Sequence, residues 1–369
     1  ELIPMAGSSY GTIFRITTWG ESHGKGLGVV VDGCPAGLSL KASDIQEYLN
    51  RRRPGRNRYS TQRAENDLVE ILSGVFEGKT TGPPISLLVP NTDQRSRDYS
   101  EIAGYYRPGH ADFGFDAKYG FRDYRGGGRS SGRETIGRVA AGAIASLLLK
   151  ELGITLCAYT RSIGPVSIEK FDEEEIESNP LKMPDAEAAE RASAWLEQCM
   201  SQKNSSGGII ECVVHGMPAG AGDPVFEKLD ANLAKAIMSI GAVKGVEIGD
   251  GFQAASATGL ENNDAFTVGE DGRITTLTNH AGGILGGISS GNDILLRAAV
   301  KPTASIAARQ RTVSRQGESI EIEIHGRHDP VIVPRAVVVV EAMTALTLID
   351  ALLLGMGSRL DNLKKIWRP

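Results

Sequence analysis

The segment Val29-Val-Val-Asp-Gly33-Cys-Pro-Ala-Gly37 decides the fold, because it recurs as Glu211-Cys-Val-Val-His215-Gly-Met-Pro-Ala-Gly220. The two copies share the pattern Gly-x-Pro-Ala-Gly, and each follows an apolar stretch typical of a strand. Each copy also precedes an amphipathic pattern that predicts a helix, at residues 43–52 and 229–240. Chance repetition is the alternative interpretation, since glycine and proline are common in turns. We interpret the repeat as two structurally related halves in one compact unit.

Outward from the repeat, apolar patterns predict strands at residues 11–19, 27–32, 67–76, 85–90, 209–214, 294–300 and 320–324. Small and apolar residues at helical spacing predict buried helices at residues 131–152 and 337–354. Tight turns between strands, with long helices between the halves, favour an α+β fold over a doubly wound sheet. We expect one domain over residues 1–369, with an exposed acidic excursion at 169–190. Residues 1–4 are expected to be an expression remnant before a native start at Met5.

The composition is that of a soluble globular protein, with 41% hydrophobic and 23% charged residues. No apolar run approaches the roughly 20 residues that a membrane-spanning helix needs. The N-terminus also lacks the charged and then apolar pattern of a secretory signal. Four widely spaced cysteines without a C-x-x-C pair are typical of reduced thiols. We therefore expect a cytoplasmic protein without a membrane partner.

Arginine is concentrated in one part of a chain whose net charge is −5. Residues 45–140 contain fourteen Arg and two Lys against twelve acidic residues, with the highest density at 51–58. The planar guanidinium binds phosphate or carboxylate through two hydrogen bonds and stays charged when desolvated. Nucleic-acid-binding faces mix Lys with Arg and raise the pI well above neutral, whereas the pI here is about 5.8. The pattern favours a small polyanionic ligand over a nucleic acid, and a solvated helix end is the alternative for Arg51 to Arg53.

Three glycine-containing loops carry an ionisable residue each. They are Gly20-Glu-Ser-His23-Gly24, Arg107-Pro-Gly-His110-Ala-Asp112 and Gly326-Arg-His-Asp329-Pro330. A single histidine is more often structural than catalytic, and we keep that interpretation for His215 and His280. Three such loops beside an arginine cluster favour a site for acid–base chemistry.

Two further loops have the composition of anion-binding sites. Gly126-Gly-Gly-Arg129-Ser-Ser131 precedes a predicted helix, whose free N–H groups and dipole attract negative charge. Lys301-Pro-Thr303-Ala-Ser305 offers a cation and two hydroxyl groups. His325 and His328 lack the further ligands of a metal centre, so no metal site is expected. These loops predict a phosphate-bearing cofactor and an anionic substrate.

The ordered set of these segments resembles the chorismate synthase family. It comprises residues 20–24, 51–55, 91–96, 107–112, 119–131, 238–252, 279–291, 301–303 and 326–330, and it spans nearly the whole chain. The resemblance implies a β-α-β sandwich assembled as a homotetramer. It also implies a lyase that converts 5-enolpyruvylshikimate 3-phosphate to chorismate by 1,4-elimination of phosphate and a ring proton, in the pathway to aromatic amino acids. The family uses reduced FMN without net redox change, and NADPH is a candidate reductant.

The resemblance also implies roles for individual residues. His23 would protonate the departing phosphate, His110 would act as a proton donor beside the flavin, and Asp329 would assist removal of the ring proton through the flavin. The implied substrate contacts are Ser22, Arg52, Arg58, Arg133 and Arg335, of which Arg52 and Arg58 are also implied for NADP. The implied FMN contacts are Arg129, Ser130, Ser131, Gly241, Ala242, Gly286, Lys301, Pro302, Thr303, Ala304, Ser305 and Arg327. The alternatives are a flavoprotein with different chemistry and a nucleic-acid binder that uses the arginine cluster.

Overall fold

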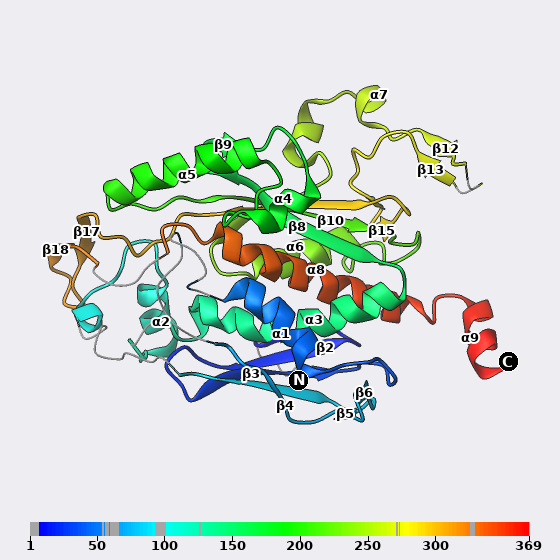
Figure 1. Cartoon of the computed structure of the whole chain (residues 1–369), viewed down its shortest axis with the longest axis horizontal. Coiled ribbons are helices and arrows are strands. Elements are labelled where there is room, and N and C mark those ends of the chain that lie inside the picture. The colour runs from blue at the N-terminus through cyan, green and yellow to red at the C-terminus, as the bar shows by residue number, and fades with distance from the viewer. Residues whose placement is uncertain are drawn as a thin grey trace.

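The computed structural model describes residues 7–53, 55, 59, 66–92, 101–124, 127–270, 272, 274–324 and 329–368. Two five-stranded antiparallel sheets enclose a layer of helices (Figure 1). The first sheet has the order β1 (Ser9–Tyr10), β2 (Arg15–Gly20), β3 (Gly26–Asp32), β7 (Ile85–Pro90), β4 (Glu70–Ile71). The second has the order β11 (Val243–Ile248), β16 (Ile294–Val300), β10 (Gly208–His215), β8 (Thr155–Ile163), β9 (Val166–Ser167). The predicted α+β sandwich is confirmed.

Four helices make up the middle layer: α1 (Ala42–Arg52), α3 (Thr135–Glu151), α6 (Leu229–Met238) and α8 (Val333–Gly355). Helix α3 packs on the first sheet and on α8, and α8 packs on β8 and β10 of the second sheet. Figure 1 shows α3 and α8 running side by side in the same direction. The core therefore lies between the sheets and around these two helices.

The remaining elements lie around this sandwich. The other helices are α2 (Asp112–Tyr119), α4 (Glu173–Ser178), α5 (Ala186–Ser201), α7 (Gly259–Asn262), α9 (Leu360–Trp367) and the 3-10 turns η2 (Glu101–Gly104), η3 (Gly128–Ser130), η4 (Gly132–Glu134) and η5 (Gly251–Ser256). The small hairpins are β5 (Val75–Phe76) with β6 (Lys79–Thr80), β12 (Phe266–Val268) with β13 (Ile274–Thr276), β14 (Ile284–Leu285) with β15 (Ile288–Ser289), and β17 (Gln310–Val313) with β18 (Ser319–Ile322).

The repeated sequence folds in the same way in both halves. The first glycine of each copy has a positive φ, 75° at Gly33 and 77° at Gly216, and the last has φ 97° at Gly37 and 102° at Gly220. Each copy docks on a small hairpin through matched hydrogen bonds. In the first copy, the Gly37 N–H donates to the Thr80 carbonyl, and the Thr80 hydroxyl donates to the Pro35 carbonyl. In the second copy, the Gly220 N–H donates to the Ser289 carbonyl, and the Ser289 hydroxyl donates to the Pro218 carbonyl. The two related halves predicted from sequence are therefore present, with α1 and α6 as counterparts.

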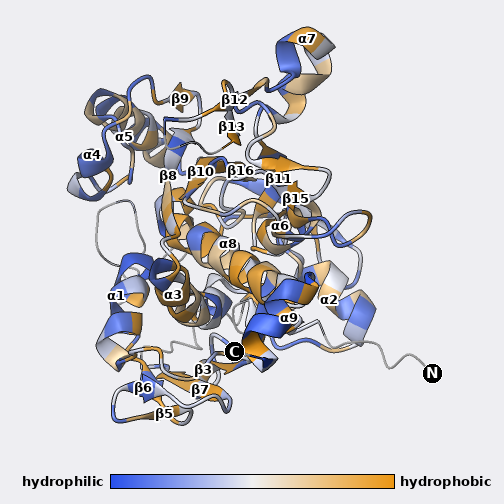
Figure 2. Cartoon of the chain, turned by 90° about the vertical axis from the view of Figure 1, so that its right-hand side faces the viewer, coloured by the Kyte–Doolittle hydropathy of each residue, from blue (hydrophilic) through white to orange (hydrophobic). Residues whose placement is uncertain are grey.

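Helix α8 forms the apolar centre of the protein. It is the one helix among the described residues that is long and apolar enough to cross a membrane, although the sequence patterns indicated no such segment. Its most apolar window is 78% buried inside the protein, as expected for a core helix. Figure 2 shows it as a largely hydrophobic helix surrounded by other elements.

Several predicted boundaries differ from the structure for identifiable reasons. Helix α8 starts at Val333, before the predicted residue 337, because Pro334 is compatible with the first helical turn. The predicted strand at 67–76 is divided between β4 and β5, since Gly74 has φ 80°. Segment 169–190 is only partly exposed. It includes α4, and two of its own residues, Leu181 and Met183, are fully buried.

The contact between α3 and α8 depends on a residue without a side chain. A Cβ atom added at Gly142 would lie 2.3 Å from Ala342 Cβ and 2.6 Å from its Cα. Both residues are buried in the middle of their helices, so neither backbone can move aside easily.

We predict that Gly142→Ala lowers the free energy of unfolding by about 1–3 kcal/mol through overpacking, despite the higher helix propensity of alanine. Gly355→Ala is the matched control, because Gly355 ends α8 with no atom within 4 Å of its added Cβ. The measurement is the thermal unfolding midpoint of both variants. Equal midpoints would contradict close packing at Gly142.

Candidate functional site

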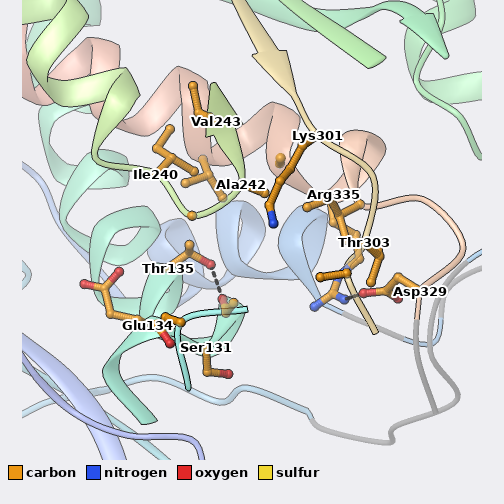
Figure 3. Close-up of a pocket in the computed structure, with 18 of the residues that line it drawn as sticks. Ser131, Glu134, Thr135, Ile240, Ala242, Val243, Lys301, Thr303, Asp329 and Arg335 are labelled. Carbon is orange, nitrogen blue, oxygen red and sulfur yellow. Dashed lines mark hydrogen bonds and ion pairs between the residues drawn. The ribbon is translucent and has the colours of Figure 1, made fainter. Parts of the chain in front are cut away.

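A cavity of about 650 Å³ lies where α3 and α8 begin and α1 and α6 end (Figure 3). Its wall includes the first turns of α3 and α8, the last residue of α1, and the turn between α6 and β11. Segments 109–111 and 301–305 close the remaining sides. The cavity is therefore built from both halves of the repeat and lies between them.

The wall of the cavity is strongly cationic. Its described lining residues include six cations, Arg52, Arg129, Arg138, Lys244, Lys301 and Arg335, and two acids, Glu134 and Asp329. Because α3 and α8 both start here, the positive ends of two helix dipoles add to this charge. The site is suited to a ligand with several negative charges.

Arg52 forms a buried ion pair beneath the cavity. Its side chain donates to Asp67 at 2.9 Å and to the Thr135 hydroxyl at 3.0 Å, and both Arg52 and Asp67 are only 2% exposed. Burial, with smaller effects of Arg335 and Arg133, lowers the pKa of Arg52 to about 10, while Asp67 opposes the shift. The guanidinium is still protonated at neutral pH, so Arg52 supplies a fixed positive charge to the wall.

Arg133 connects this ion pair to the loop that carries Ser22 and His23. It donates to Asp67 at 3.0 Å and to the Asn91 side-chain oxygen at 2.8 Å. Asn91 in turn donates to the carbonyls of Glu21 and Gly24, on either side of Ser22 and His23. The Ser22 hydroxyl is buried without a hydrogen-bond partner in the described part of the chain. Through Asn91, Arg133 thus holds the loop that carries Ser22 and His23, and it is not among the lining residues of the cavity.

His110 is oriented by a buried carboxylate. Its Nδ1 lies 3.0 Å from Asp112 Oδ1, and Arg107 and Arg122 also donate to Asp112. Although burial alone would raise it, the hydrogen bonds from Arg107 and His110 hold the pKa of Asp112 well below its usual range. The stability this carboxylate contributes is present above its unfolded pKa and is lost only as the pH falls through the lower folded pKa. Arg107 Nη2 also lies 3.0 Å from His110 Nδ1, so Asp112 and Arg107 together fix the ring, and Nε2 is the ring nitrogen without a partner among the described residues.

Asp329 and Lys301 lie in the same cavity. Asp329 is ion-paired with Arg335, which also donates to the Arg52 carbonyl at 3.2 Å. The Lys301 ammonium donates to the Gly109 carbonyl, and its backbone N–H donates to the Ala242 carbonyl at 2.9 Å. Figure 3 shows Lys301, Arg335 and Asp329 on one side and Ser131 and Thr135 on the other.

The polar groups of the predicted anion cradle at 129–131 are mostly engaged with the protein itself. Arg129 donates to the carbonyls of Thr18 and Gly20 at the end of β2. The Ser130 hydroxyl donates to Gly127, and the Ser131 hydroxyl accepts the Arg133 N–H. This loop therefore shapes the wall, and in this arrangement its hydroxyl groups hold the turn.

Most residues predicted from sequence meet in this cavity. The predicted residues that line it are His110, Asp329, Arg52, Arg335, Arg129, Ser130, Ser131, Gly241, Ala242, Lys301, Pro302, Thr303, Ala304 and Ser305. His23, Ser22, Arg133 and Gly286 are not among its described lining residues. Gly286 lies in the turn of the β14–β15 hairpin, the counterpart of β5–β6. Arg58 and Arg327 lie outside the described residues.

Four charged residues of the site were not predicted from the sequence: Asp67, Glu134, Arg138 and Lys244. The only local signal was the spacing of Glu134 and Arg138, which is that of a helical i, i+4 ion pair. Asp67 had no such signal, because its partners come from α1 and from the segment before α3.

We predict that Asp67→Asn destabilises the fold by about 3–5 kcal/mol, because two buried guanidinium groups would lose their shared counter-charge. Asn suits the φ of 46° at this position, so the change tests charge and not backbone strain. The control is Glu187→Gln, which removes one partner of an exposed pair with Lys170. The measurement is denaturant unfolding, and equal midpoints for the two variants would contradict the buried ion pair.

Comparison with known proteins identifies the family. The family model described as chorismate synthase matches residues 14–353. A chorismate synthase of Agathobacter rectalis is 67% identical over 99% of this chain and 100% of the relative, and one of Chloroflexus aurantiacus is 57% identical over 95% and 96%. A solved structure titled "Crystal Structure of Chorismate Synthase" is 33% identical, covers 96% of both chains and has a TM-score of 0.75. The chain therefore belongs to the chorismate synthase family.

Proposed function

We propose that the chain is a lyase that makes chorismate, by eliminating phosphate and a ring proton from 5-enolpyruvylshikimate 3-phosphate. The observation that carries this proposal is the meeting of Arg52, Arg335 and Lys301 with His110 and Asp329 in one cavity. Family membership at 54–67% identity with chorismate synthases supports the same reaction.

The cations of the cavity suit a substrate with one phosphate and two carboxylates. Phosphate leaves a carbon atom readily only when its charge is neutralised and its oxygen is protonated. Fixed guanidinium and ammonium groups, with two helix N-termini, stabilise that developing charge without reorganising. Since Arg52 is bonded to Asp67 and Thr135, it acts on the ligand through its charge.

Proton transfers require groups of opposite character. We propose His110 as a donor, because Asp112 fixes the orientation of its ring at the cavity. We propose Asp329 as the proton acceptor, and its ion pair with Arg335 keeps the carboxylate in the cavity. His23 stays a proposal for the proton that the departing phosphate takes up, and its loop is held by Asn91.

The cavity also fits the flavin that the family needs. Its volume of about 650 Å³ is in the range of cofactor sites. The Thr303 hydroxyl is buried without a hydrogen-bond partner among the described residues. We propose FMN, held by segments 129–131, 241–242 and 301–305, with Gly286 and Arg327 as further predicted contacts. When bound, reduced flavin would supply electron density to the elimination without net redox change.

The source of reduced flavin is a separate proposal. NADPH is the candidate reductant, with Arg58 and Arg52 as the predicted contacts.

We propose a cytoplasmic location, because the four cysteines are all unpaired thiols. Burial raises the pKa of Cys34 and Cys157 to about 11, so these thiols stay protonated. No nucleic-acid or membrane partner is proposed.

We predict phosphate release from 5-enolpyruvylshikimate 3-phosphate under anaerobic conditions with chemically reduced FMN. His110→Ala is expected to lower turnover by about 10²-fold or more through loss of the proton donor. Phosphate release and chorismate absorbance are the measurements. Absence of both products in the wild-type reaction would refute the proposed lyase.

His215→Ala is the matched control for His110. His215 is also bonded through Nδ1 to an aspartate, Asp293, at 2.9 Å, but it lies outside the cavity lining. Its removal should leave turnover unchanged. Equal losses in the two variants would contradict a specific role for His110.

We also propose that the chain forms a homotetramer. Large apolar side chains are exposed at the edge of the first sheet, as at Leu68 and Leu72, and along α9, as at Leu363 and Ile366. Apolar side chains exposed at a sheet edge or along one helix are suited to contacts between chains. Light scattering after size exclusion should give four times the chain mass of 39.3 kDa. Leu363→Asp combined with Ile366→Asp should favour smaller species, and a monomeric wild type would refute assembly.

A further inference from the structure

Arg138 is a cavity cation that the sequence motifs do not include. It lies in the second turn of α3, and its side chain is 17% exposed. Its Nε is paired with Glu134 at 2.7 Å, and its Nη1 donates to the Ser239 hydroxyl at 2.6 Å. Ser239 follows the last residue of α6, so Arg138 links α3 of one half to the end of α6 in the other.

The opposite wall of the cavity has the same arrangement. Arg335 lies in the first turn of α8, is paired with Asp329, and donates to the carbonyl of Arg52 at the end of α1. Since α1 and α6 are counterparts in the repeat, Arg138 and Arg335 occupy corresponding positions. Each side chain is anchored by a carboxylate and by the end of a helix from the partner half.

Both arginines keep a donor for a ligand. Neither Arg138 Nη2 nor Arg335 Nη2 has an acceptor among the described residues, and both side chains line the cavity. Arg335 lies beside Asp329 and Lys301, where the substrate is expected. Arg138 lies beside the turn with Gly241 and Ala242, whose backbone N–H groups also lack acceptors in the described part of the chain.

We propose that Arg138 is a cofactor-binding residue, whose Nη2 donates to an oxygen of the flavin nucleotide. The two related arginines would then divide the cavity, with Arg335 on the substrate side and Arg138 on the cofactor side. Glu134 and Ser239 fix the guanidinium before the ligand arrives, which limits the entropy lost on binding. This inference rests on the proposed flavin dependence.

The test is the affinity for oxidised FMN, measured by flavin fluorescence without turnover. Arg138→Ala should raise the dissociation constant at least ~10-fold through loss of a charge-assisted hydrogen bond. Arg138→Lys, which keeps the charge, should recover part of this loss. Repeating the titration with riboflavin locates the acceptor, because a loss confined to FMN assigns the phosphate and a loss shared with riboflavin assigns the ring.

Arg297→Ala is the matched control. Arg297 is similarly shielded at 19% exposed and paired with Glu211, but it lies outside the cavity lining. It should bind FMN like the wild type. Wild-type affinity in Arg138→Ala, or an equal loss in Arg297→Ala, would overturn this inference alone. A wild-type protein that does not bind FMN would instead refute the proposed cofactor and the inference with it.

Discussion

The close contact of α3 with α8 is the constraint on which the site depends. At Gly142 there is no space for a side chain against Ala342, so the two helices approach closely in the middle of the sandwich. Because they run in the same direction, their N-termini meet at one end of the molecule (Figure 1). Two helix N-termini in one place produce a positive field before any side chain is added. The arginines and Lys301 add positive charge at defined places on the cavity wall.

The internal repeat explains why the cavity has two similar walls. Matched turns at Gly33 to Gly37 and Gly216 to Gly220 precede α1 and α6 in the two halves. Each of these helices ends at the cavity, where an arginine from the neighbouring long helix contacts it. A site between related halves can bind two different ligands, because equivalent positions carry different neighbours. Asp329 and Lys301 belong to one wall, and the Gly241–Ala242 turn belongs to the other.

The parts of this arrangement that depend on neighbouring residues could be predicted from the sequence. The glycine turns, the apolar strands and helix α3 follow from patterns within a few residues. The ordered family segments located most of the cavity lining. The ion pairs beneath the cavity could not be predicted, because their partners are distant in sequence. Arg52 and Asp67 meet across the end of α1, and Arg138 meets Ser239 over 101 residues. The contacts of Arg129 could not be predicted either, since only the fold brings it to the carbonyls of Thr18 and Gly20.

The central claim is that one cavity between the two halves holds both flavin and substrate. The most direct measurement is a crystal structure of the protein with oxidised FMN and 5-enolpyruvylshikimate 3-phosphate. The account predicts electron density for both ligands between α3 and α8, with the flavin beside Ala242 and Arg138 and the substrate beside Arg335 and Asp329. Density for either ligand outside this cavity would contradict it.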